Sequence, residues 1–529
     1  MLDRNQVLPH RIGQLAESDP DGLAMLDVDG RTATFAQMRD TIRAWAAGYA
    51  RLGVREGQPV LTLVPNSFES YFAWLGLAWL KALEVPTNTM YRGTMLAYLL
   101  NNSGAEIAVM SARFLDRLAE VAGDVERLKT VVVPDADSTA DLPALPFDVI
   151  TGAQFLDGAP TDGIGDGPEY YDIACIIYTS GTTGPSKGVL VPWAELYEFV
   201  RIMPPETLPE GRALYTTYPA FHVSGKAMLY ATADRHGQLV LRESFSLSEF
   251  WNDIRRFDCY SCGLVGPMAA LLMLNPPADD DADNPLQTTF MGPIVPQVDE
   301  FKMRFGVDKV GTGFGMTEVG APLSSNGFTL VNNTSCGRRR TGPPGYQVRI
   351  VDEHDEEVPP GTVGELLVRA DEPWVINAGY WNLPEKTAEA WRNGWFHTGD
   401  GFREDEDGNF YFVDRLKDAI RRRGENISSF EVEAGINAHP SVQECAVIGV
   451  PSELGEDDVK AVIVLMPDTK TTPEEIIEFL EPRMPRFMIP RYIEFVDALP
   501  KTDATFRTQK VKLRDNALND MTWDRERSQ

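Results

Sequence analysis

Hydrophobic side chains recur along the first 330 residues with two different periods. In residues 30–54 the apolar positions follow helical spacing, at Phe35, Met38, Ile42, Trp45, Ala46 and Tyr49. This pattern predicts a helix that ends near Gly53, just before the short β-type run PVLTLVP. A second helical pattern extends from Phe68 to Leu83. Helices therefore alternate with short apolar runs in this region.

The short apolar runs at residues 107–111, 131–134 and 172–180 predict strands. Continuous apolar strands that alternate with helices are typical of parallel sheets covered on both faces. The sequence therefore predicts an α/β fold for the large N-terminal part of the chain.

The pattern changes after residue 330 and again after residue 418. The runs GYQVRIVD, GELLVRA and GNFYFVD are separated by Gly, Pro and Asp, which predicts a β-rich subdomain. A small α+β domain of about 110 residues is predicted beyond it. There Thr472 can cap a helix that has Pro473 at its first position and Glu475 completing a capping box.

Composition narrows the functional classes. The chain has 529 residues, 43% of them hydrophobic, and a net charge of −29. Such acidity argues against nucleic-acid binding and against docking on an anionic membrane surface. An anionic ligand would need local basic groups, for which residues 338–340 and 421–423 are candidates. The alternative is that both are solvated charge runs.

No targeting or membrane segment is evident. The first residues lack a basic flank and an apolar core, and the apolar stretch at 71–80 is too short to span a bilayer. Five cysteines favour a reducing compartment, so a cytoplasmic location is expected. Cys259 and Cys262 form a CxxC without a second pair, which favours a strand over a metal site.

Residues 178–189 read YTSGTTGPSKGV and follow the apolar strand IACII directly. Glycines there permit the backbone geometry of an anion-binding loop, and the hydroxyls and Lys187 add donors and charge. The GxxxxGK[ST] spacing of a Walker A loop is absent. Taken alone, the segment could equally be a surface turn.

Three further segments accompany this loop in a fixed order: GFGMTE (313–318), GWFHTGD (394–400) and DRLKDAIRRRGENISSFEVE (414–433). Together they resemble the adenylate-forming superfamily of acyl-CoA synthetases, adenylation domains and luciferases, over nearly the whole chain. The segments GENISSFEVE, VPSELGEDDVKAVIVL and RMPRFMIPRYIEFVDALPKT most resemble crotonobetaine/carnitine-CoA and bile-acid-CoA ligases. The resemblance implies an N-terminal domain at 1–416 and a mobile C-terminal domain at 417–529, with a hinge at Lys417.

The resemblance also implies a reaction in two steps. A carboxylic acid reacts with ATP and Mg²⁺ to give an acyl-adenylate and pyrophosphate, and the thiol of CoA then displaces AMP. Little covalent protein chemistry is needed, so positioning and charge stabilisation would dominate. The expected partners are the acid, ATP and CoA, with an assembly of identical subunits left open.

The family motifs assign roles to individual positions. ATP and AMP contacts fall on Thr179, Ser180, Gly181, Thr182, Thr183, Gly184, Lys187, Gly292, Phe314, Gly315, Met316, Thr317, Asp400, Phe412 and Arg415. The acyl pocket is assigned to His222, Ser224, Gly225 and Gly320, and the CoA channel to Gly424, Glu425 and Asn426. Catalytic roles fall on Arg507, Lys417, Thr317, Glu318 and His222, with Glu318 also holding Mg²⁺. Glycine at 225 and 320 could instead reflect tight backbone packing.

The C-terminal tail departs from the family pattern. Family members usually read PKTxxGKxxK with a catalytic lysine, whereas this chain reads PKTDATFRTQKVKLR and brings Arg507 to that position. Three interpretations are open: Arg507 replaces the lysine as a permanent, bidentate charge, Lys510 swings in, or the adenylation step is impaired. The functional alternatives are an acyl-CoA ligase, an enzyme that loads a carrier protein, a luciferase-type oxidase and a degenerate nucleotide-binding protein.

Overall fold

The computed structural model describes residues 2–158, 164–179, 186–342, 345–415, 420–422, 425–427, 429–452, 457–501 and 508–527. At residues 415, 421, 422, 425, 426 and 431 only the backbone is described. The chain divides into two compact units: unit 1 comprises residues 1–348 and 368–396, and unit 2 comprises residues 349–367 and 397–529. The boundary expected at Lys417 stays a prediction, because Lys417 lies outside the described residues.

Helices in the described part of the chain are mostly short and amphipathic. They are α1 (Leu8–Ser18), α2 (Phe35–Arg51), α3 (Phe68–Trp79), α4 (Gly93–Ser103), α5 (Leu115–Val121), α6 (Gly152–Leu156), α7 (Trp193–Arg201), α8 (Val223–Asp234), α9 (Phe250–Arg256), α10 (Gly266–Leu274), α11 (Val298–Phe305), α12 (Pro384–Ala390), α13 (Ser429–Asn437), α14 (Pro473–Leu480) and α15 (Lys510–Arg514). Short 3₁₀ turns are η1 (Arg4–Gln6), η2 (Ala112–Phe114), η3 (Ala122–Asp124), η4 (Pro205–Thr207) and η5 (Arg392–Gly394).

Strands make up the sheets of both units. Those in the first half of the chain are β1 (Leu23–Asp27), β2 (Thr32–Thr34), β3 (Pro59–Leu63), β4 (Leu83–Pro86), β5 (Ile107–Met110), β6 (Thr130–Val133), β7 (Asp148–Thr151), β8 (Ile173–Thr179), β9 (Lys187–Pro192), β10 (Ala213–Thr216), β11 (Gln238–Leu241) and β12 (Cys259–Val265). The later ones are β13 (Thr288–Gly292), β14 (Lys309–Gly311), β15 (Gly313–Met316), β16 (Gly320–Ser324), β17 (Ser335–Arg339), β18 (Tyr346–Val351), β19 (Gly364–Ala370), β20 (Phe396–Glu404), β21 (Asn409–Arg415), β22 (Ile420–Arg422), β23 (Glu425–Ile427), β24 (Val442–Pro451), β25 (Asp457–Leu465), β26 (Tyr492–Phe495) and β27 (Trp523–Asp524).

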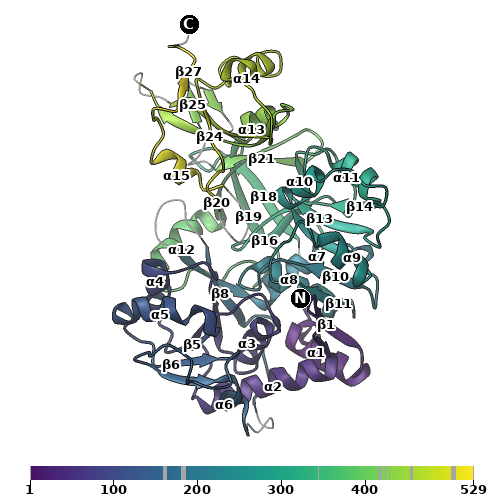
Figure 1. Ribbon diagram of the computed structural model, residues 1–529, viewed down its shortest axis with the longest axis vertical. Coiled ribbons are helices and arrows are strands. Elements are labelled where there is room, and N and C mark those ends of the chain that lie inside the picture. Colours follow the sequence, from purple (N-terminus) through teal and green to yellow (C-terminus); the bar gives the residue numbers. More distant parts are fainter. Residues whose placement is uncertain are drawn as a thin grey trace. The chain divides into compact units, whose positions relative to one another are not determined.

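Unit 1 contains a seven-stranded sheet in the order β7-β6-β5-β3-β4-β8-β9. Its pairs are parallel except for the hairpin of β8 and β9 at one edge. Alternate strand residues such as Leu61, Met110 and Val131 pack under α4 and α5. The helices α2 and α3 lie on the other side of this sheet (Figure 1).

The second sheet of unit 1 runs β14-β13-β12-β10-β11-β1-β2, and only β1 and β2 pair antiparallel in it. Helix α8 packs against β10 and β11, whereas α9 and α10 pack against β12. The α/β prediction is therefore confirmed. A smaller antiparallel group of β15, β16 and β17 also belongs to unit 1.

Unit 2 is built on antiparallel pairs. Strand β20 pairs with β21, β22 with β23, and β24 with β25, which is joined in parallel by β26. Its core consists of side chains from α13, α14, β24 and β25, among them Val432, Ile476 and Val459. Helix α14 begins at the predicted cap: Thr472 accepts a hydrogen bond from the Glu475 backbone N–H, and the Glu475 side chain completes the capping box.

Several local predictions are confirmed by these elements. Helix α2 buries all six of the apolar positions predicted from 30–54, and Gly53 follows it with a φ of +78°. Cys259 and Cys262 lie in strand β12, and both are buried with free thiols. Within the described ranges no helix combines the length and apolarity needed to cross a bilayer.

A buried ion pair joins helix α8 to strand β4 of the first large sheet in unit 1. The Lys226 ammonium on α8 contacts the carboxylate of Glu84 on β4, and both side chains are almost completely buried. Thr62 donates a second hydrogen bond to Glu84 over 2.9 Å, and the Lys226 Nζ lies 4.0 Å from the ring centre of Trp74. Burial raises the pKa of Glu84, while Lys226 pulls it down. Each charge therefore depends on the other for its stability in the core.

Lys226→Met is expected to reduce the free energy of unfolding by about 3–5 kcal/mol, because Glu84 would be left buried without its cation. Lys129→Met, which breaks the exposed Lys129–Glu106 pair, is the matched control and should cost no more than about 1 kcal/mol. Urea unfolding followed by tryptophan fluorescence measures both. The double variant Lys226→Met/Glu84→Leu should recover most of the loss. Equal effects of the two single variants would contradict the assignment.

Candidate active site

The glycine-rich loop joins the two strands of the edge hairpin. Thr179 ends β8 and lies opposite Lys187, the first residue of β9. The loop residues Ser180, Gly181, Thr182, Thr183 and Gly184 lie outside the described residues. The hairpin thus fixes the two ends of the loop, with a hydroxyl on one strand and an ammonium on the other.

A second hairpin carries the GFGMTE segment. Phe314, Gly315 and Met316 lie on β15, and the turn that follows contains Thr317 and Glu318. Both turn side chains are buried, each at 6% exposure. Gly320 closes the turn with a φ of +64°, a conformation that residues with a Cβ rarely adopt. This turn holds Glu318 in a fixed place beside the first hairpin.

Glu318 is the point at which these elements meet. Its Oε1 lies 3.5 Å from the Thr179 hydroxyl and 3.4 Å from the Tyr380 hydroxyl, both of which can donate to it. The Lys187 Nζ lies 4.4 Å from the centre of the Tyr380 ring, a cation–π contact. One carboxylate, two hydroxyls and one ammonium are thereby gathered in one corner of unit 1.

Tyr380 and Asn377 were missed by sequence reasoning. Asn377 donates through its side-chain amide to the Glu318 carbonyl over 2.5 Å, and its backbone N–H donates to the same oxygen over 3.2 Å. Both residues lie in NAGYW (377–381), which runs beside β9. Their contribution depends on a pairing with residues about 190 positions away, so no local pattern marks them.

Buried acids lie behind Glu318 on helix α7. Burial, and after it the charge of Glu318, raises the pKa of Glu195 well above its ordinary value, which favours the neutral form of this carboxyl. Glu198 is paired instead: Arg340 contacts it over 3.0 Å and Arg201 over 3.1 Å. Of the basic run 338–340, Arg340 therefore faces a buried acid of the core, whereas the side chains of Arg338 and Arg339 are exposed.

His222 begins helix α8 and caps it. Its Nδ1 accepts a hydrogen bond from the Ser224 backbone N–H over 3.3 Å and lies 2.9 Å from the Ser224 hydroxyl. Because Nδ1 accepts, the ring proton is assigned to Nε2. Burial lowers the pKa of His222 to about 4, so the ring is neutral at pH 7.

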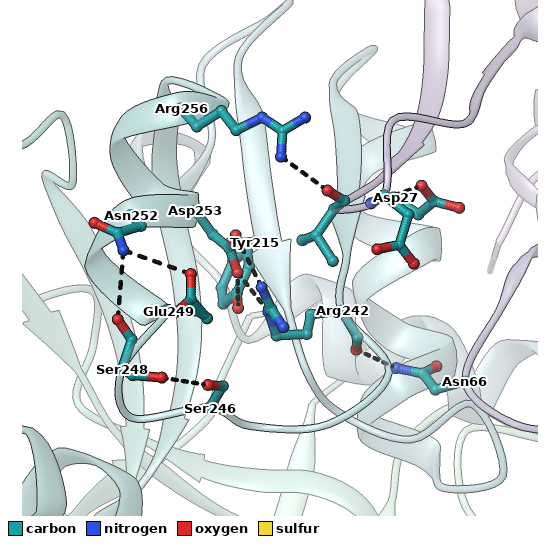
Figure 2. A network of polar contacts seen from close by, with 12 residues as sticks. Asp27, Asn66, Tyr215, Arg242, Ser246, Ser248, Glu249, Asn252, Asp253 and Arg256 are labelled. Carbon is teal, nitrogen blue, oxygen red and sulfur yellow. Dashed lines mark hydrogen bonds and ion pairs between the residues drawn. The ribbon is translucent and has the colours of Figure 1, made fainter.

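Asn66 holds the turn that precedes His222. Its Oδ1 accepts from the Ala220 N–H over 3.2 Å, and its Nδ2 donates to the Arg242 carbonyl over 3.1 Å. Figure 2 shows Asn66 beside Arg242, whose guanidinium contacts the carboxylate of Asp253. The ends of β3 and β11 are in this way tied to the His222 turn.

The glycines assigned to the acyl pocket have close neighbours. A Cβ at Gly225 would lie 2.2 Å from the Pro219 carbonyl oxygen, and one at Gly320 would lie 2.9 Å from the Tyr346 hydroxyl. These approaches account for glycine by backbone packing at both positions. The acyl-pocket role of His222, Ser224, Gly225 and Gly320 stays a prediction.

The positions assigned to the adenine lie at neighbouring strand ends. Gly292 ends β13, and no atom lies within 4 Å of the place a Cβ would take. Thr312, just before β15, donates to the carbonyl of Met291 over 2.8 Å. This bond links the end of β13 to the start of the strand that carries Phe314. Gly292 and Phe314 therefore lie at neighbouring strand ends of unit 1.

Unit 2 carries the ribose and hinge assignments. Asp400 on β20 lies opposite Arg415 on β21. On the same pair of strands the rings of Phe412 and Phe402 meet edge to face, 5.6 Å apart. Asp400 is almost completely buried.

The remaining assignments of unit 2 are described only in part. Glu425 and Asn426 belong to strand β23, described by backbone alone. Lys417, Gly424 and Arg507 lie outside the described residues. Their assigned roles stay predictions.

Lys510 is held in place within unit 2. Its Nζ lies 2.8 Å from Glu433 Oε1 and also contacts the Ser429 hydroxyl, which in turn donates to Asp414. Glu433 accepts a further hydrogen bond from the Val447 N–H over 2.8 Å. Lys510 thus belongs to a buried network that ties α13 to the tail.

Comparisons of sequence identify both parts of the chain. The AMP-binding enzyme family matches residues 14–381, and the AMP-binding enzyme C-terminal domain matches residues 431–505. Crotonobetaine/carnitine–CoA ligases of Citrobacter koseri and Salmonella typhimurium are 30% identical to this chain over 493 and 488 residues. Each alignment covers 89% of this chain and 91% of the relative.

Solved structures with the same fold include CoA ligases. The anthranilate CoA ligase AuaEII in complex with anthranoyl-AMP matches with a TM-score of 0.86 and 25% identity, over 98% of both chains. A benzoate CoA ligase from Burkholderia xenovorans matches with a TM-score of 0.84 and 22% identity, over 96% of this chain and 99% of that one. The second match concerns the fold alone.

The buried acid Glu198 predicts a pH dependence of stability. Burial raises the pKa of Glu198 to about 7, against the opposing pull of Arg340 and Arg201. The folded state keeps this proton at pH values where the unfolded chain, with a glutamate pKa of about 4.3, has lost it. The free energy of unfolding therefore falls as the pH rises from the unfolded value toward 7.

Glu198→Gln removes this titration, so its melting temperature relative to the unmodified chain should increase between pH 5 and about pH 7 and level off by pH 8. Differential scanning fluorimetry across that range measures the difference. Glu206→Gln, at an exposed position of the following turn, is the control. A difference for Glu198→Gln that is flat with pH would contradict the raised pKa.

Proposed function

Because the chain belongs to the AMP-binding enzyme family, we propose that it is an acyl-CoA ligase that consumes ATP in two half-reactions. In the first, a carboxylic acid becomes an acyl-adenylate with release of pyrophosphate. In the second, CoA takes the acyl group as a thioester and AMP leaves. The similarity to CoA ligases along almost the whole chain supports an acid–thiol ligase.

The observation that carries the proposal is the corner around Glu318. Lys187 and Thr179 border the glycine-rich loop, and Glu318 accepts from the hydroxyls of Thr179 and Tyr380. Lys187 would balance the charge of the β- and γ-phosphates, together with loop residues 180–184. Thr317, next to Glu318, would donate to the α-phosphate. Such preorganised donors stabilise charge that develops on phosphate oxygens.

The same corner suits Mg²⁺. A hard cation prefers oxygen ligands and is commonly held by one carboxylate together with substrate phosphates and water. The Glu318 carboxylate, with the Thr179 hydroxyl 3.5 Å away, offers such an oxygen set. When bound, Mg²⁺ would neutralise phosphate charge. Tyr380 and Asn377 keep the Glu318 side chain and backbone in place for it.

Adenylation needs orientation more than protein nucleophiles. A carboxylate oxygen of the acid attacks the α-phosphorus, the bond to the bridging oxygen breaks, and pyrophosphate leaves with the electron pair. Gly292 would leave room at the edge of the adenine, and Phe314 would cover its face. In unit 2, Asp400 would accept from both ribose hydroxyls, Phe412 would pack near the nucleoside, and Arg415 would reach the ribose and phosphate.

Thioester formation follows after rotation about Lys417, which exchanges the two conformations. The CoA sulfur bonds to the acyl carbon, its proton passes to solvent, and AMP leaves with the electrons of the broken acyl–oxygen bond. Gly424, Glu425 and Asn426 would line the pantetheine channel. His222, neutral and with its proton assigned to Nε2, would donate to an acyl oxygen and has no need to act as a base.

The activity test has two parts. ATP–pyrophosphate exchange is measured across a panel of carboxylic acids that includes anthranilate, benzoate and carnitine, and the active acids are then assayed with free CoA. Exchange followed by CoA thioester formation is expected. Exchange with transfer only to a carrier-protein phosphopantetheine would instead indicate a carrier-loading enzyme. ATP binding without exchange for any acid would indicate a degenerate homologue.

Arg507 is proposed to supply the charge that the family lysine supplies. Arg507→Ala should therefore slow ATP–pyrophosphate exchange by at least about a hundredfold, since a charge-assisted contact in a desolvated site is lost. CoA transfer from preformed acyl-adenylate should change little. Arg507→Lys tests whether the family residue restores or exceeds the rate. Equal loss in both half-reactions of Arg507→Ala would contradict this role.

A further inference from the structure

Glu365 on β19 is a buried carboxylate to which the proposed function assigns no role. Its Oε1 accepts the backbone N–H of Gly399 over 2.9 Å, and its Oε2 lies 2.9 Å from Nδ1 of His397. The side chains are 12% and 3% exposed for Glu365 and His397, so water competes little for these bonds. A carboxylate only accepts, so Nδ1 of His397 carries the donated proton.

Both anchors belong to the first residues of β20, which lead into Asp400. Between them, the Thr398 hydroxyl donates to the carbonyl of Leu366 over 2.7 Å and accepts the Asp400 N–H over 3.1 Å. Residues 397, 398 and 399 are thus each tied to residue 365 or 366. The position of the Asp400 backbone follows from these ties.

The backbone conformation of Gly399 explains why its N–H needs the fixed partner that Glu365 provides. Its φ is +71°, and no atom lies within 4 Å of the place a Cβ would take, so glycine serves the backbone and not the packing. A glycine in this region has many alternative conformations. The bond from its N–H to Glu365 selects one of them, immediately before Asp400.

We propose that Glu365 is a positioning residue that orients Asp400 toward the two ribose hydroxyls of the nucleotide. This inference rests on the proposed function, which assigns the ribose to Asp400. Two hydroxyls can bind one carboxylate together only if its plane and distance are fixed to within about 0.5 Å. Without Glu365, residues 397–400 lose the two hydrogen bonds that its carboxylate accepts from His397 and Gly399, and Asp400 loses that orientation.

The test compares nucleotides with and without ribose hydroxyls. Dissociation constants for ATP and 2′,3′-dideoxy-ATP are measured by calorimetry, and their ratio reports the ribose contacts alone. The unmodified chain should prefer ATP by at least about 100-fold, as expected for two hydrogen bonds to a charged group. Asp400→Ala should bring the ratio close to one.

Glu365→Leu removes both acceptors at similar size and should lower the ratio to threefold or less, while dideoxy-ATP binding changes less than twofold. Glu365→Gln keeps an acceptor for Gly399, and its amide NH2 can donate to Nδ1 of His397 once the ring proton moves to Nε2, so it should retain most of the preference. Glu353→Ala, at an exposed glutamate of unit 2, is the control. A purely structural role would weaken both nucleotides equally and leave the ratio unchanged.

A full ratio in Glu365→Leu, with the ratio lost in Asp400→Ala, overturns the positioning role and leaves the proposed function intact. A full ratio in Asp400→Ala, or no ATP binding by the unmodified chain, overturns both. If Glu365→Leu does not fold, Glu365→Asp keeps the charge but is one methylene too short for both anchors. It should lower the ratio at least threefold, and an unchanged ratio there also overturns the proposal.

Discussion

The candidate site depends on the backbone pairing of residues 378–381 with strand β9. Ala378 donates to the Leu190 carbonyl over 3.0 Å, the Leu190 N–H donates to Gly379 over 3.0 Å, and Trp381 donates to Gly188 over 2.7 Å. These bonds give the edge strand of a large sheet a partner, which exposed edges otherwise lack. They also bring the Tyr380 hydroxyl to Glu318 and its ring to Lys187. A substitution that broke this pairing would disrupt the site without altering any residue to which a ligand contact is assigned.

The charge state of the acidic residues near Glu318 is a second constraint on this corner of unit 1. A chain with a net charge of −29 has few cations for the polyphosphate that it is proposed to bind, so the acids near the site would have to be neutral or paired. Burial raises the pKa of Glu195 and so favours its neutral form, and Glu198 has two arginine partners. In this corner it is the carboxylate of Glu318 that lies beside the hydroxyls of Thr179 and Tyr380. A metal ion and Lys187 could then compensate the negative charge of the phosphates locally.

Local sequence predicted those features whose causes are local. The α2 stripe, the α14 capping box and the strand before the glycine-rich loop depend on neighbours within a few residues, and all three were found. The pairing of 377–381 with β9 and the Lys226–Glu84 pair join residues distant in sequence, and no periodicity encodes them. Motifs marked Glu318 and Asp400 because whole segments matched a family. Tyr380 and Glu365 escaped notice because their roles arise only from contacts between such segments.

The contacts of Lys510 bear on the unusual tail. For Lys510 to reach a substrate, its ammonium would have to leave Glu433 and Ser429, which would strip a carboxyl that is itself buried of its cation. Burial already raises the pKa of Glu433, and Lys510 is the first influence that lowers it. The Lys510 and Glu433 side chains are only 18% and 16% exposed, so separating this pair would leave a poorly solvated carboxylate without its cation. The bridge between Lys501 and Thr508 and the bond from Gln509 to the Pro500 carbonyl also fix the chain on either side of 502–507. With Lys510 held by Glu433 and Ser429, Arg507, the basic residue of 502–507, stays the residue proposed to supply this charge.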